Sequence, residues 1–105
     1  LTAPAGAPIE LIFNNRSRHH QHNWVLVNGG DAEAQAVYET AVAAGVKNDW
    51  LPPASPQIIA HTPLIDSGKS FTLSFQAPTQ AGSYLYICTF PGHFLAGMKG
   101  TLTIT

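Results

Sequence analysis

The chain has 105 residues, of which 45% are hydrophobic and only 10% are charged, and its formal net charge is −1. This length predicts one domain, residues 1–105, that encloses a single hydrophobic core. The absence of a basic stripe argues against nucleic-acid binding, and the low charge predicts an apolar docking surface. No apolar run is long enough to span a membrane. Because the sequence starts at Leu1, the presence of a preceding leader or membrane anchor stays open.

Several short segments, rich in β-branched and aromatic residues, show a period of two, as β-strands do. The alternating hydrophobic sets, in chain order, are Ile9, Leu11 and Phe13; Trp24 and Leu26; Phe71, Leu73 and Phe75; Leu85 and Ile87; and Leu102 and Ile104. Glycine, proline and asparagine separate these segments. The pattern predicts an all-β sandwich or barrel.

The segment DAEAQAVYETAVAAG, residues 31–45, departs from this period. It predicts one inserted helix, with Asp31 as its N-cap and Gly45 just past its end. Its hydrophobic residues on one helical face are Val37, Tyr38, Ala41 and Val42. The following WLPPASPQ, residues 50–57, contains three prolines and predicts an irregular connection.

The only cysteine and the only methionine of the chain lie in one loop, CTFPGHFLAGM, on either side of His93. A single cysteine rules out an internal disulfide. The loop reads Cys88-x4-His93-x4-Met98 between two predicted strands. Thiolate, imidazole and thioether groups are soft or borderline metal donors, so the loop predicts most of a metal site with one ligand still to be found.

His22 is the best-placed candidate for the missing ligand. The other candidates are His19, His20 and His61. By period two, His22 shares the face of Trp24, whose large indole is expected in the core. His20 has the same parity but lies earlier, in a polar loop, and His61 is expected at the surface.

The donor set His22, Cys88, His93 and Met98 suits one copper ion better than zinc. Two imidazoles and a thiolate with a weak axial thioether are typical of electron-transfer copper sites. Structural zinc sites are closed tetrahedral sets of cysteine and histidine. A site without an open position exchanges electrons and binds no substrate, so we expect a one-electron carrier that alternates between Cu(I) and Cu(II), not an enzyme.

Two other functions stay open at this point. One is a copper carrier or storage protein, although three ligands on one loop do not suit a labile site. The other is a thiol enzyme with Cys88 as nucleophile and a histidine as base. Met98 argues against the enzyme, because a nucleophile has no use for a thioether.

The segments HNWVL, IAHTPLIDSG and CTFPGH…MKGTL closely resemble azurin-like cupredoxins. The single cysteine, the helical insert and the longer spacing between His93 and Met98 are more similar to the auracyanins, the blue copper proteins of filamentous anoxygenic phototrophs. The resemblance implies a Greek-key β-sandwich with the copper at one end. It leaves open whether the Gln21 carbonyl contacts the copper, because azurins have a glycine there.

The resemblance also implies supporting contacts around the ligands. Asn23 and Thr89 would tie the two ligand segments together, and the backbone N–H groups of Asn23 and Phe90 would point at the Cys88 sulfur. Such contacts orient ligands and tune the reduction potential. Independently of the resemblance, Tyr84 or Tyr86 is expected to form a tyrosine corner.

The resemblance further implies how electrons leave and where the protein works. The edge of His93 would reach the surface through an apolar patch with Pro91, Phe94 and Leu95. The redox partners would be a membrane quinol-oxidising complex and a reaction-centre cytochrome. The protein would then be periplasmic, outside the cytoplasm, with a membrane tether in a segment ahead of Leu1 as one arrangement.

Overall fold

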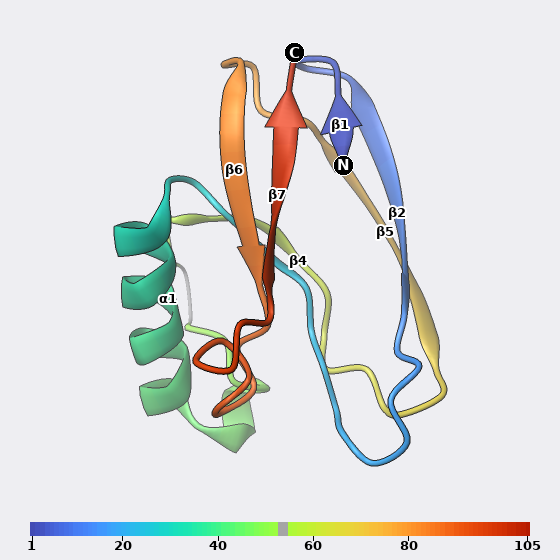
Figure 1. Cartoon of the computed structure of the whole chain (residues 1–105), viewed down its shortest axis with the longest axis vertical. Helices are drawn as coiled ribbons and strands as arrows, with labels where there is room; N and C mark the ends of the chain where they lie inside the picture. The colour runs from blue at the N-terminus through green and yellow to red at the C-terminus, as the bar shows by residue number, and fades with distance from the viewer. Residues whose placement is uncertain (53–54) are drawn as a thin grey trace.

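The computed structural model describes residues 1–52 and 55–105 and forms two sheets and one long helix (Figure 1). The larger sheet has the strand order β1-β7-β6-β3-β4, and the smaller sheet pairs β2 with β5. The strands are β1 (Thr2–Ala3), β2 (Pro8–Asn14), β3 (Val25–Val27), β4 (Ile58–His61), β5 (Ser70–Gln76), β6 (Gly82–Ile87) and β7 (Lys99–Ile104). All pairs are antiparallel except β1 with β7. The predicted all-β Greek-key sandwich with one inserted helix is confirmed.

The main core lies between the two sheets and follows from the period-two pattern. Exposed and half-buried residues alternate along the whole of β2 and β5. Their hydrophobic faces pack against the larger sheet, which contributes Trp24, Leu26, Tyr84, Leu102 and Ile104. Burying these side chains supplies most of the free energy that stabilises the sandwich.

A second core lies on the other face of the larger sheet, beneath helix α1 (Asp31–Ala44). Val25, Val27 and Ile87 of the sheet pack against Val37 and Tyr38 of the helix. Strand β3 is therefore buried on both faces, and all three of its residues are fully buried. This explains why β3 is hydrophobic throughout instead of alternating.

The helix has the predicted buried face, but its start differs from the prediction by one residue. Val37, Tyr38 and Ala41 are buried as expected and Val42 is half-buried. The prediction of Asp31 as N-cap is wrong, because Gly30 caps the helix and its N–H donates to the Glu33 carboxylate at 3.1 Å. The Glu33 side chain thus satisfies the N–H of the capping residue, while Gly30 has no side chain that could accept from the N–H groups of the first turn.

The helix ends at Ala44, and Gly45 follows it with a φ of 80°, which favours glycine. A 3₁₀ turn, η1 (Val46–Asn48), comes next. The predicted irregular connection over 50–57 includes residues 53 and 54, which lie outside the described residues. In the described parts of the chain, no helix has the length and apolar character that crossing a bilayer requires.

Tyr84 forms the predicted tyrosine corner, since its hydroxyl donates to the Gln80 carbonyl at 2.7 Å. This contact fixes the start of β6. At the other end of β6, the chain enters the loop that holds Cys88 and His93. Figure 1 shows this loop beside α1, at the end of the sandwich opposite the C-terminus.

Candidate metal centre

The loop from Cys88 to Met98 is compact because its own backbone closes it. The Cys88 N–H donates to the Met98 carbonyl at 3.2 Å, so the two ends of the loop lie side by side. Within the loop, the His93 N–H donates to the Phe90 carbonyl and the Met98 N–H donates to the His93 carbonyl, both at 3.1 Å. These turns fix the path of the chain between Cys88 and His93.

His22 reaches the same place from another part of the chain. Just before β3, it forms an isolated bridge with Ile65, in which each N–H donates to the other carbonyl, at 3.2 and 2.8 Å. The Asn15 side-chain amide donates to the carbonyls of His20 and Ile65, at 2.9 and 2.8 Å. The backbone on both sides of His22 is therefore fixed by hydrogen bonds.

The three side chains His22, Cys88 and His93 face one another. The Cys88 Sγ lies 3.7 Å from His22 Nδ1 and 3.4 Å from His93 Nδ1, and the three donor atoms lie within 4.8 Å of one another. Bonds of about 2.3 Å to sulfur and 2.0 Å to nitrogen, meeting at roughly 110° to 120°, separate two donors by about 3.5 to 3.7 Å. The two sulfur–nitrogen spacings thus fit an ion bound between the thiol and each imidazole.

The Cys88 sulfur is shielded from water, and backbone N–H groups point at it. Cys88 is only 4% exposed. Burial raises the pKa of its thiol, and hydrogen bonds from the backbone N–H groups of Asn23 and Phe90 partly oppose this. These are the N–H groups expected from the resemblance. They stabilise the thiolate, the form in which cysteine binds a metal.

The surroundings of the two imidazoles favour the neutral form, which is the form that binds a metal. Burial lowers the pKa of His22, and the neighbouring His93 and His20 lower it further. Burial also lowers the pKa of His93, again with a contribution from His20. A neutral imidazole offers a lone pair to a metal without first losing a proton.

Two buried polar side chains tie the ligand segments together, as expected from the resemblance. The Asn23 amide donates to Thr89 Oγ1 at 2.7 Å, and the Thr89 N–H donates to Asn23 Oδ1 at 2.8 Å. Both residues are buried, at 3% and 0% exposure. Buried polar groups must be paired, so this reciprocal pair fixes the approach of His22 to Cys88.

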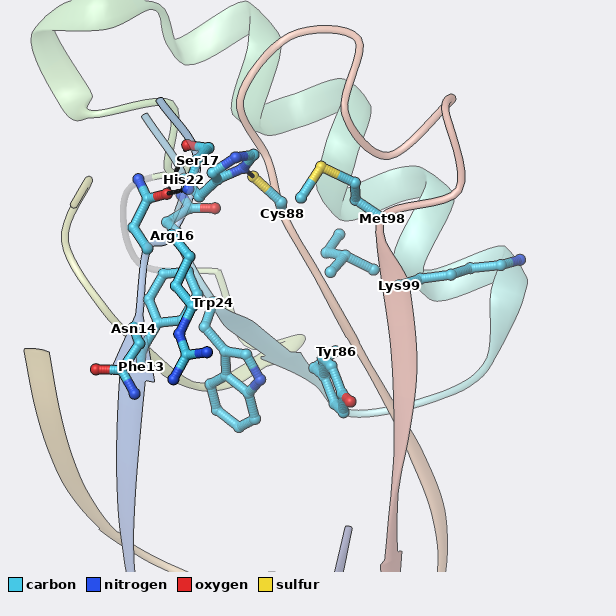
Figure 2. Close-up of a pocket in the computed structure, with 13 residues that line it drawn as sticks. Phe13, Asn14, Arg16, Ser17, His22, Trp24, Tyr86, Cys88, Met98 and Lys99 are labelled. Atoms are coloured by element: carbon cyan, nitrogen blue, oxygen red, sulfur yellow. Dashed lines mark hydrogen bonds between the residues drawn. The ribbon is translucent and has the colours of Figure 1, made fainter. Parts of the chain in front are cut away.

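Met98 borders the same space as the other predicted ligands. A cavity of about 340 Å³ is lined by His22, Cys88 and Met98, among others. Figure 2 shows the Met98 thioether on the same side of the loop as the Cys88 sulfur. The side chain is 38% exposed. Its role as the weak fourth ligand stays a prediction.

The remaining sequence candidates lie outside the three-residue cluster. His61 is exposed at the end of β4, and His19 is exposed in the loop before His22. The side-chain amide of Gln21 donates to Asp66 at 2.8 Å. His20 is exposed, yet its ring lies 5.7 Å from that of His93. The sequence pattern does not predict this proximity, since it depends on how the loop folds back over the site.

The expected apolar patch around His93 differs from the prediction in one residue. Leu95 is 69% exposed and Pro91 is half-buried, but Phe94 is only 9% exposed. Phe94 turns inward and packs its ring against Tyr38 of α1, with 5.2 Å between ring centroids. Sequence reasoning also missed that the Tyr38 hydroxyl accepts a hydrogen bond from Gly92 N–H, at 2.7 Å.

Comparison with known proteins gives a consistent result. The sequence model of "Copper binding proteins, plastocyanin/azurin family" matches residues 1–105. The chain is 48% identical to auracyanin-B of Chloroflexus aurantiacus over all of its own length and 45% of that protein. It is 42% identical to azurin of Pseudomonas aeruginosa over 79% of its length and 55% of that protein. The chain thus spans about half the length of these relatives.

Solved structures show the same likeness. Dithionite-reduced auracyanin from the photosynthetic bacterium Roseiflexus castenholzii superimposes with a TM-score of 0.95 at 42% identity, covering all of this chain and 82% of that one. Auracyanin B superimposes with a TM-score of 0.93 at 48% identity, covering all of this chain and 76% of that one. With its buried thiol between two imidazoles, the chain belongs to the plastocyanin/azurin family of copper-binding proteins.

Proposed function

We propose that the chain is a blue copper protein that carries one electron at a time. The observation that carries this proposal is the convergence of His22, Cys88 and His93, with Sγ at 3.4 and 3.7 Å from the two Nδ1 atoms. A bound copper ion supplies the Cu(I)/Cu(II) couple, and its bond to thiolate gives such centres their blue colour. Met98 is proposed as the weak fourth donor.

The protein's own contribution is to keep the donors in place. Three features fix the backbone that carries the donors. They are the bridge between His22 and Ile65, the closed loop from Cys88 to Met98, and the hydrogen-bonded pair of Asn23 and Thr89. Nothing in this arrangement has to move when the charge of the site changes by one. Preorganised dipoles avoid reorganisation at the moment of transfer, which is what a fast carrier needs.

A role as thiol enzyme fits the environment of Cys88 poorly. Reactive cysteines are partly exposed and have a lowered pKa. Cys88 is 4% exposed and burial raises its pKa. We therefore infer that the thiol is a ligand and that the protein catalyses no reaction of its own.

We infer that electrons pass through His93 to partners that dock on the apolar patch defined by Pro91, His93 and Leu95. Leu95 is a large hydrophobic residue exposed within two positions of His93. The partners proposed are a membrane quinol-oxidising complex as donor and a reaction-centre cytochrome as acceptor. Support comes from the likeness to auracyanins of photosynthetic bacteria. Such a carrier would work outside the cytoplasm, in the periplasm, either free or tethered to the membrane.

The experiment that tests this function is a visible spectrum of the copper-loaded protein followed by a redox titration. An intense thiolate-to-copper charge-transfer band that bleaches on reduction and returns on oxidation is expected. A copper-loaded protein without that band, or one that loses its copper on each reduction, contradicts the electron carrier. The second result would instead favour a copper carrier or storage protein.

A further inference from the structure

Helix α1 and the segment after it contact the ligand loop and the residue just beyond it at several points. At the start of the loop, Thr89 Oγ1 donates to the Trp50 carbonyl at 2.5 Å, and the rings of Trp50 and Phe90 lie 6.0 Å apart. Just beyond Met98, the Lys99 ammonium lies 3.1 Å from the Asp31 carboxylate. The helical insert is therefore packed against the segment that carries three of the four predicted ligands.

The most specific of these contacts lies in the middle of the loop, at Tyr38. Its hydroxyl accepts a hydrogen bond from Gly92 N–H at 2.7 Å, and its ring packs on Phe94 at 5.2 Å. Gly92 and Phe94 flank His93 on either side. Tyr38 and Phe94 are 6% and 9% exposed, so the contact between their rings is shielded from water. The hydrogen bond is part-buried, because the Tyr38 side lies in the core while Gly92 is exposed.

The need for this contact follows from the backbone beside His93. Gly92 has a φ of +88°, a conformation open to glycine, and its Cβ position faces open space. A glycine loses more conformational freedom than any other residue when it is fixed. The phenol oxygen is the partner that fixes this N–H.

The ion pair of Lys99 and Asp31 has side chains 45% and 78% exposed, and exposed pairs contribute little to stability.

We propose that Tyr38 is the positioning residue for His93. Its hydroxyl and ring together hold the Gly92–Phe94 segment in the same place in the metal-free and the metal-loaded protein. The imidazole of His93 is then presented to the metal without a search through loop conformations. Tyr38 does not touch the donor atoms in this arrangement and acts through the backbone on both sides of His93. The inference rests on the proposed copper function only where a bound ion is used as the probe.

The test compares two single-hydroxyl deletions, Tyr38→Phe and Tyr84→Phe. Each removes one phenol oxygen from a buried ring and keeps the ring itself. The Tyr84 hydroxyl donates to the Gln80 carbonyl at the far end of β6 and has no contact with the ligand loop. Tyr84→Phe thus controls for a general loss of stability.

The first measurement is amide hydrogen exchange of Gly92 and His93 in the metal-free proteins. Losing one hydrogen bond is expected to raise these exchange rates about fivefold in Tyr38→Phe and to leave them unchanged in Tyr84→Phe. The second is the rate at which copper is lost to excess chelator, which is expected to rise by a similar factor in Tyr38→Phe alone.

Equal exchange and equal copper loss in Tyr38→Phe and the unchanged protein would overturn the proposal, as would equal acceleration in both variants. These outcomes are distinct from failure of the proposed function. A protein that never turns blue with copper contradicts the electron carrier, while exchange in the metal-free protein still decides the role of Tyr38.

Discussion

Cys88 is the residue on which the visible colour of the protein depends. It is the only cysteine in the chain, so no other thiolate can replace it. We predict that Cys88→Ser abolishes the blue colour while the fold persists, because serine is a poor donor of charge to copper. The visible spectrum of the copper-loaded variant, with circular dichroism as a check on folding, measures this.

The matched control is His61→Ala. His61 is exposed on β4 and lies outside the cluster of His22, Cys88 and His93. It should keep the full colour. A Cys88→Ser protein that stays blue would mean that the metal centre is elsewhere.

Met98 tests the assignment of the weak donor. Its thioether borders the cavity at the ligands, and a weak axial ligand tunes the reduction potential. We predict that Met98→Leu keeps the colour, because the thiolate remains, and raises the potential, because a donor to the oxidised ion is lost. Voltammetry of the copper-loaded variant gives the answer.

Leu95→Ala is the comparison for Met98→Leu, since Leu95 lies in the same loop, 69% exposed, and offers no donor atom. Its potential should stay unchanged. A lower potential in Met98→Leu than in the unchanged protein would show that the axial assignment is wrong.

At the scale of elements, Gly100 shows how the strand pair beside the metal loop is packed. Gly100 of β7 pairs with Tyr86 of β6, and the Tyr86 ring lies over it. An added Cβ would collide with that ring, which also packs on Trp24 at 5.3 Å. We predict that Gly100→Ala destabilises the metal-free protein by about 1–3 kcal/mol, measured by denaturant unfolding.

Thr101→Ala, at an exposed position next along the strand, should change the stability by no more than about 0.5 kcal/mol. If Gly100→Ala and Thr101→Ala lower the free energy of unfolding by the same amount, the packing of Tyr86 over Gly100 does not stabilise the protein specifically.

Much of the element structure could be predicted because the signals are local. Period two predicts β2, β5 and β7, and the parity of His22 with Trp24 selects, among several histidines, the one that lies beside Cys88 and His93. The predicted helix start is off by one residue, since Gly30 has no side chain to signal a cap. The contact of Tyr38 with Gly92 joins residues 54 positions apart. Such a pairing depends on how the helix docks, which no local pattern encodes.

The same limit explains why the apolar patch implied by the resemblance includes Phe94. Its neighbours Leu95 and Pro91 suggest one continuous apolar patch, but the docked helix offers Phe94 a buried partner. Hydrophobic residues in a loop go inward wherever a neighbouring element leaves room for them.

At the scale of the whole molecule, the ligands should limit the pH range in which the metal-free protein is stable. The pKa values of His22 and His93 lie below the ordinary 6.5, chiefly because of burial. Below pH 6.5 these two histidines bind more protons in the unfolded chain than in the folded protein, so the free energy of unfolding falls as the pH falls. Burial raises the pKa of Cys88 above 9.0, so stability also falls as the pH rises past 9.0.

We thus predict that the contribution of these three groups to stability is largest between pH 6.5 and 9.0. Denaturant unfolding of the metal-free protein across this range measures it. Cys88→Ala should remove the loss on the alkaline side and leave the acid side unchanged. If a protein that retains both histidines becomes more stable on acidification below pH 6.5, the predicted direction of this pH dependence is wrong.

The burial of β3 on both faces has a consequence for the order of folding. The strand separates the two cores and contributes to each: Val25 and Val27 belong to the helix core, and Leu26 belongs to the sandwich core. A partly folded chain that has assembled only one of the two cores leaves half of β3 in water. Neither core alone therefore makes a stable intermediate, so we expect refolding to be all-or-none. His22, three positions ahead of this strand, should become ordered in the same step.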